Sequence, residues 1–193
     1  MTDSDAKAVL RLAMRDRRTA LAVDRPDAAL HAAAIWRDAD RAPPITAAVY
    51  LPLGAEMDAL PLASVLQAQG VRLALPVVAD AQAPLVFRRW SPGDVMTVDA
   101  LGIAAPPAEA EVCTPDLVVA PLLAFDRRGR RLGQGGGYYD RTLEALRREG
   151  RVYAVGLAYA EQEVDSLQEE AHDQRLDAVL TDGGLIVCGE EAA

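Results

Sequence analysis

The sequence predicts an α/β fold with a mainly parallel sheet flanked by helices. Short apolar runs alternate along the chain with segments of helical periodicity, as expected where a crossover helix follows each parallel strand. Several runs, such as DLVVAPLLAF at residues 116–125, are apolar at successive positions, which indicates strands buried on both faces. With 193 residues, the chain has the length of one domain that can bury a core without disulfides or metals.

The first 40 residues are expected to form a helical segment that packs on the α/β core of a single domain covering residues 1–193. A helix is predicted from a cap at Ser4 or Asp5 to about Ala22. Its apolar face would consist of Val9, Leu10, Ala13 and Met14. A cationic stripe recurs at intervals of three and four residues and consists of Lys7, Arg11, Arg15 and Arg18. The simplest interpretation of this stripe is a solvated helix face.

The remaining elements follow from apolar runs, helical periodicity and glycine stops. A second helix is predicted from Asp24 and Pro26 to Trp36. Strands are predicted at residues 46–53, 71–78, 85–90, 116–125, 152–159 and 178–187. Helices at residues 58–69 and 138–149 are followed by stops at Gly70 and Gly150. Turns and short strand are expected between residues 91 and 115.

Composition limits the possible partners and the location. The net charge of −9 argues against a general nucleic-acid or anionic-membrane surface, so any anion site must be a local basic pocket. Two cysteines are too few for a disulfide scaffold or a tetrahedral zinc site, which makes a reducing cytoplasm the expected location. No apolar run reaches the length of a membrane span, and the N-terminal residues lack the apolar region of a secretory signal.

Lys7 is the single lysine of a chain that has 19 arginines. A coding bias toward alanine and arginine would remove lysines wherever arginine can replace them. Lys7 is then either a chance survivor on an exposed helix or a position that requires a compact ammonium group.

The segment RRLGQGGGYYDR, residues 130–141, carries the strongest functional signal. It lies between a buried strand and a helix start, where open α/β sheets bind ligands. Between residues 126 and 151, eight arginines accompany four acids, a local charge of +4. Glycines let a ligand approach the backbone, and a helix N-terminus suits phosphate. The segment predicts an anion site, with a flexible surface hairpin as the alternative.

Two better-known phosphate loops are excluded by the spacing. A Walker loop requires a lysine and a serine or threonine after its last glycine, and this segment has neither. The dinucleotide fingerprint requires a glycine where Tyr138 stands, on a tight turn directly after the strand.

Acids near strand ends and helix starts are candidate ligands. Asp140, in the first turn of a predicted helix, either compensates the helix dipole or binds a Mg²⁺ that bridges phosphate oxygens. Asp173 is a candidate second carboxylate, and His172 beside it is an acid/base group or, more simply, an exposed loop histidine. Glu56 follows a predicted strand and is either a solvated acid or an acceptor for an amide or amino-heterocycle edge.

Seven segments spread over nearly the whole chain read KAVLR with Arg18 behind it, YLPLGAEMD, LALPVV, FRRWSPGD, PDLVVAPLLAFDRRGRRLGQGGGYYDR, VGLAYAEQEVD and HDQRLDAVLTD. Together, and in this order, they resemble the 5-formyltetrahydrofolate cyclo-ligase family, also called methenyltetrahydrofolate synthetases. The resemblance implies an α/β sandwich of the sugar-isomerase and CoA-transferase type. The sequence departs from the family at Gln134, often aromatic or basic there, and at GIAAPP, which replaces a more usual Gly-Ile-Pro-Glu-Pro.

Carried over by position, the resemblance implies three sets of site residues. The ATP set is Lys7, Arg11, Arg131, Leu132, Gly133, Gln134, Gly135, Gly136, Gly137, Tyr138 and Tyr139. The folate set is Leu51, Glu56, Gln134, Gly135, Gly136, Gly137 and Tyr138. The metal ligands are Asp140 and Asp173, and catalysis is expected to depend on Lys7, Arg131 and Asp140.

The implied reaction uses ATP and Mg²⁺ to close 5-formyltetrahydrofolate into 5,10-methenyltetrahydrofolate. Transfer of the γ-phosphoryl group to the formyl oxygen makes that oxygen a good leaving group, and N10 can then attack the formyl carbon. Two alternative interpretations are a sugar-phosphate isomerase, which would need neither ATP nor magnesium, and a non-catalytic folate- or nucleotide-binding module. We expect a monomer.

Overall fold

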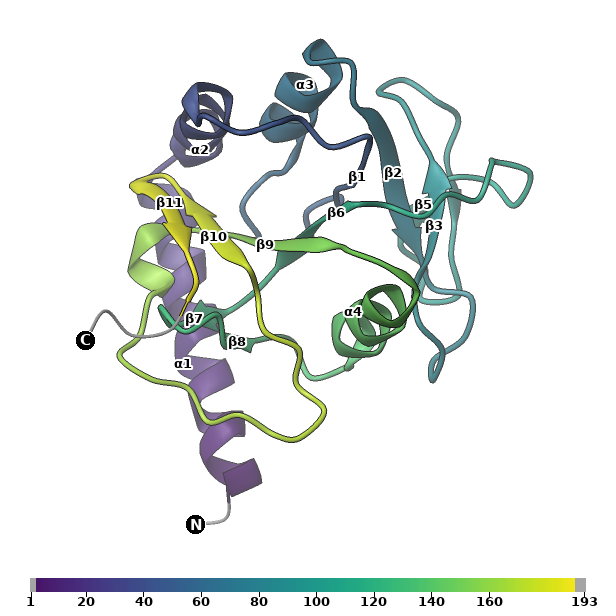
Figure 1. Cartoon of the computed structure of the whole chain (residues 1–193). Helices are drawn as coiled ribbons and strands as arrows, with labels where there is room; N and C mark the ends of the chain where they lie inside the picture. Colours follow the sequence, from purple (N-terminus) through teal and green to yellow (C-terminus); the bar gives the residue numbers. More distant parts are fainter. Residues whose placement is uncertain (1–2, 190–193) are drawn as a thin grey trace.

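A mainly parallel seven-stranded sheet forms the centre of the molecule (Figure 1). The computed structural model describes residues 3–189. Along the order β11-β10-β9-β6-β1-β2-β3, the strands from β10 to β2 are parallel and the two edge strands are antiparallel. The strands are β1 (Thr46–Ala48), β2 (Arg72–Val77), β3 (Val86–Arg89), β6 (Leu117–Pro121), β9 (Tyr153–Ala158), β10 (Ala178–Thr181) and β11 (Gly184–Val187). The predicted α/β class is confirmed.

Helices cover both faces of the sheet. Figure 1 shows α2 (Ala28–Asp38) and α3 (Leu60–Ala68) on one side and α4 (Tyr138–Glu149) on the other. Trp36 and Leu62 belong to the core on the first side, and Leu143 belongs to the core on the second. None of the helices in the described part of the chain combines the length and apolar character needed to cross a bilayer.

The helix α1 (Asp3–Asp24) packs on a small hairpin beside the main sheet. The hairpin consists of β7 (Ala124–Phe125) and β8 (Arg131–Leu132), and Met14 of α1 shares a buried cluster with Leu123 and Leu132. Within the region expected to hold turns, β4 (Thr97–Val98) and β5 (Ala104–Ala105) form another short antiparallel pair. A 3₁₀ helix, η1 (Ala160–Gln162), follows β9.

The buried face of α1 differs from the predicted one. Val9 is 63% exposed and Ala13 is also exposed, whereas Met14 and Arg18 are buried. Lys7 and Arg11 are half-buried and Arg15 alone of the cationic stripe is exposed, so the interpretation of the stripe as a solvated face was wrong. The physical reason is that acids and backbone carbonyls lie opposite these cations and replace water as their partners. The helix also begins at Asp3, ahead of the predicted caps.

Several predicted strands are shorter than expected. β1 ends at Ala48, and only the Val49 N–H still donates to the Ala74 carbonyl, at 3.0 Å. The predicted strand at residues 116–125 divides into β6 and β7, since Pro121 at the end of β6 has no N–H to continue the ladder. Residues 178–187 form an antiparallel hairpin, and the second helix begins at Ala28 and ends at Asp38.

Candidate active site

One cavity of about 430 Å³ lies at the carboxyl ends of β1, β2 and β6. This is the edge at which open α/β sheets bind ligands. Every residue predicted from the sequence to belong to the site lines this cavity. These residues are Lys7, Arg11, Leu51, Glu56 and Asp173, together with all ten residues of the segment 131–140.

The glycine segment reaches the cavity as bare backbone tied to α1. Gly135 and Gly137 have φ values of +101° and +66°, which favour glycine, and a Cβ at Gly137 would lie 2.7 Å from Nη1 of Arg141. Arg11 Nε donates to the Gly133 carbonyl at 3.1 Å, and two nitrogens of Arg15 donate to Gln134 Oε1 at 3.0 and 2.8 Å. These contacts do not favour the alternative of a flexible surface hairpin.

Gly137 directly precedes α4. It is the N-cap residue of the helix, and no side chain forms a capping hydrogen bond to the first turn. The first N–H groups of a helix without a side-chain cap and the positive end of its dipole favour an anion at this position.

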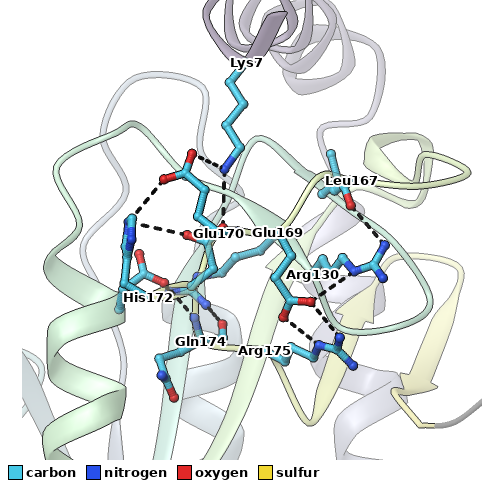
Figure 2. A network of polar contacts seen from close by, with 12 residues as sticks. Lys7, Arg130, Leu167, Glu169, Glu170, His172, Gln174 and Arg175 are labelled. Atoms are coloured by element: carbon cyan, nitrogen blue, oxygen red, sulfur yellow. Dashed lines mark hydrogen bonds and ion pairs between the residues drawn. The ribbon is translucent and has the colours of Figure 1, made fainter. Parts of the chain in front are cut away.

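The ammonium group of Lys7 extends from α1 to two acids of the segment between η1 and β10 (Figure 2). Its Nζ lies 2.7 Å from Glu170 Oε1 and 3.3 Å from Asp173 Oδ2. Burial alone would lower the pKa of Lys7, but the hydrogen bond to Glu170 and the charge of Asp173 outweigh burial and raise that pKa. His172 is 70% exposed, as expected for a loop histidine.

Asp140 and Asp173 are brought together through Gln174. Asp140 Oδ1 accepts from Arg131 Nη2 at 2.7 Å and from the Gln174 N–H at 3.0 Å, while Arg131 Nη1 also donates to the Gln174 carbonyl. Because Asp173 directly precedes Gln174, this bond places the backbone of Asp173 beside the Asp140 carboxylate, and both side chains line the cavity. Burial lowers the pKa of the Arg131 guanidinium, against the opposing effect of Asp140.

The donor set at this end of the cavity fits magnesium held jointly with phosphate. Among the side chains that the structure describes, residues 6–189, no group of three or more histidine, cysteine or acidic side chains could hold a metal on its own. Magnesium is usually bound by one or two carboxylates plus substrate phosphates and water. Asp140 and Asp173 are the carboxylates that could hold such an ion, and both line the cavity together with the glycine segment.

Glu56 is a buried acid and not a solvated one. Its Oε2 accepts from the Leu53 N–H at 3.0 Å, and its Oε1 lies 3.6 Å from Nη1 of Arg18. The pKa of Tyr139 is raised, mainly because the side chain is buried and further because the negative charge of Glu56 is nearby. Burial also raises the pKa of Tyr50, whose hydroxyl donates to the Met57 carbonyl at 2.7 Å.

The apolar lining was not predicted from the sequence. It comes from separate elements and includes Leu75, Pro76, Val78, Leu85, Leu101 and Ile103. Apolar residues of this kind are typical of any core, so no local pattern distinguishes them. Glu170 was also missed, because a loop acid has no sequence signal beyond its charge.

Residues 3–182 match the sequence profile of the 5-formyltetrahydrofolate cyclo-ligase family. The 5-formyltetrahydrofolate cyclo-ligase of Escherichia coli is 37% identical over 141 residues, covering 70% of this chain and 77% of that protein. The enzyme of the same name from Mycolicibacterium smegmatis is 34% identical over 145 residues, with coverages of 70% and 73%. The NMR structure of Aquifex aeolicus 5,10-methenyltetrahydrofolate synthetase superposes with a TM-score of 0.77 at 27% identity, covering 97% of this chain and 95% of that one.

Proposed function

Because the chain belongs to the 5-formyltetrahydrofolate cyclo-ligase family, we propose that it uses ATP to close 5-formyltetrahydrofolate into 5,10-methenyltetrahydrofolate. The observation that carries this proposal is the single cavity with two unlike ends. One end has bare backbone, cations and two carboxylates, and the other has a buried acid among apolar side chains. The first suits a nucleotide's phosphates, and the second suits a flat heterocycle with N–H donors.

The phosphate end is proposed to bind the triphosphate through backbone and cations. The N–H groups of the glycine segment and the start of α4 would donate to phosphate oxygens. Lys7 and Arg11 would add charge-assisted hydrogen bonds, each contributing roughly 1.5–3 kcal/mol. Arg131 is already bonded to Asp140, so its proposed role is to orient that carboxylate and to add positive charge near the phosphates.

Asp140 and Asp173 would hold magnesium. Bound there, the ion would neutralise charge on the phosphate oxygens. Lys7 now occupies one oxygen of Asp173, so this carboxylate and Lys7 would exchange partners when the nucleotide enters.

The chain's own contribution is to hold two substrates in reacting contact. The formyl oxygen attacks the γ-phosphorus and the bond from that phosphorus to ADP breaks. N10 then attacks the activated formyl carbon, the bond to phosphate breaks, and N10 loses its proton. Phosphoryl transfer needs positioning and charge stabilisation more than covalent help from the protein, and the cavity supplies both through the glycine segment and Glu56.

The deciding experiment follows the absorbance band of the methenyl product with and without ATP and Mg²⁺. We expect formation of the band only when both are present. Isomerisation of a sugar phosphate without ATP would support the isomerase alternative. Binding of 5-formyltetrahydrofolate with no rise in the band would support a non-catalytic module.

We also propose that the enzyme works in the cytoplasm as a monomer, with no nucleic-acid or membrane partner. The net charge of −9 disfavours polyanionic partners, and Cys113 and Cys188 are both free thiols. Light scattering during size-exclusion chromatography would test the monomer, and a dimer mass would contradict it.

A further inference from the structure

Arg18 is an arginine buried behind the cavity wall. Its side chain is 6% exposed, and on α1 it lies one turn after the buried Met14. Nη1 donates to the Leu122 carbonyl at 3.1 Å and lies 3.6 Å from Glu56 Oε1. Nε is buried and has no hydrogen-bond partner among the described residues. A buried guanidinium is costly unless it is paired, so its charge needs an explanation.

Docking of α1 does not by itself explain this charge. Met14 shows that an apolar side chain serves the same helix face, and buried ion pairs are often replaced by apolar residues without loss of stability. The feature that an apolar residue could not reproduce is the positive charge beside Glu56. Glu56 is the acid that lines the cavity among apolar side chains and is itself 5% exposed.

We propose that Arg18 is a positioning residue that holds the Glu56 carboxylate in the orientation that binds the folate. Arg18 and the Leu53 N–H hold one carboxylate oxygen each, on Oε1 and Oε2. A carboxylate has about four lone-pair sites, so acceptor capacity remains on both oxygens. Two adjacent N–H donors, such as the 2-amino group and N3–H of a pterin ring, are the class of ligand edge that this arrangement accepts. The proposal rests on the proposed function.

The position of Arg18 on α1 separates its effect from nucleotide binding. Lys7 and Arg11 line the phosphate end of the cavity, and Arg18 lies eleven residues beyond Lys7. At a rise of 1.5 Å per residue this separation is about 16 Å along the helix. Substitution of Arg18 should therefore alter the affinity for the folate and leave the affinity for ATP nearly unchanged.

The test compares Arg18→Met, Arg18→Lys, Glu56→Gln and the double variant Arg18→Met/Glu56→Gln. For Arg18→Met we expect KM for 5-formyltetrahydrofolate to rise about tenfold or more, with KM for ATP within about twofold. Arg18→Lys should recover part of the loss, because it keeps the charge. In the Glu56→Gln background, Arg18→Met should add little further effect. Arg17→Met is the matched control, since Arg17 is the exposed neighbour on the same helix, and it should change neither KM.

Equal rises in both KM values, or additive effects in the double variant, would overturn the proposal and leave Arg18 a structural residue. If Arg18→Met does not fold, Arg18→Lys decides the matter: it should raise the folate KM alone. If the wild-type chain shows no turnover, titration of 5-formyltetrahydrofolate without ATP tests the positioning role of Arg18 separately from the proposed reaction. Weaker binding by Arg18→Lys would then support the positioning role although the proposed reaction had failed, and equal binding would contradict it.

Discussion

The two ends of the cavity hold their charges in opposite ways. At the phosphate end, Lys7, Glu170 and Asp173 form an open network in contact with solvent, with side chains that are 13%, 51% and 26% exposed. At the folate end, Arg18 and Glu56 form a buried pair, with side chains that are only 6% and 5% exposed. The open network can exchange partners with an entering ligand, whereas the buried pair must remain intact.

Energies explain this division. An exposed ion pair contributes about 0–1 kcal/mol, so its loss when a triphosphate arrives costs little. Removing one partner from a buried pair costs about 3–5 kcal/mol, because the remaining charge has no counterion. A protein that must bind a highly charged ligand at one end and a nearly neutral ring at the other therefore benefits from loosely paired charges at the first and a fixed pair at the second.

The largest expected effect comes from the acid beside Arg131. Asp140→Asn should lower kcat by on the order of 100-fold or more while shifting Tm by only a few degrees. The asparagine oxygen can still accept from Arg131 and the Gln174 N–H, but the negative charge proposed to hold magnesium is lost. Turnover and thermal unfolding are measured on the same samples, with Glu144→Gln on α4 as the control. A loss of stability that accounts for the loss of turnover would assign Asp140 to the helix alone.

Lys7→Ala should weaken ATP binding about tenfold with the fold intact. The ammonium group is the compact cation that the open network would release to the phosphates. Titration calorimetry with ATP measures the affinity, and Val9→Ala at an exposed position of α1 is the control. An unchanged affinity would remove Lys7 from the nucleotide site.

A smaller effect of opposite sign is expected at Glu170. Glu170→Gln should tighten ATP binding about two- to threefold, because it weakens a contact that competes with phosphate for Lys7. Glu169→Gln, which affects an acid paired with Arg130 and Arg175, should leave the affinity unchanged. Weaker ATP binding by Glu170→Gln would show that this acid assists the nucleotide and would contradict the idea of exchanging partners.

The smallest effect is a pH dependence of stability. The pKa of Lys7 is raised above its usual 10.5 in the folded state, so its pairs stabilise the fold fully below that pH and lose their effect as the pH rises through the folded value. The difference in unfolding free energy between the wild type and Lys7→Ala, about 0.5 kcal/mol near neutral pH, should shrink above pH 10.5. Urea unfolding at several pH values measures it. A difference that grows with pH would contradict the pairing.

The order of strands and helices was predictable because each element has its own local signal. The glycine segment and Asp140 could be found from the sequence since phosphate binding requires bare backbone and charge within a few consecutive residues. The inward face of α1 was predicted wrongly because periodicity ranks Val9 and Ala13 above cations, whereas the acids that attract Lys7 lie more than 160 positions away. The apolar lining depended on packing between separate strands, which no single segment encodes.

The ion pair between Arg131 and Asp140 joins residues nine positions apart and so closes the glycine segment into a ring. Much of the entropy that a glycine-rich chain would lose on grasping a ligand is then lost during folding. An extra glycine inserted between Arg131 and Asp140 would lengthen that ring and return backbone freedom to it, so we expect such a variant to bind ATP more weakly although every side chain of the site is retained.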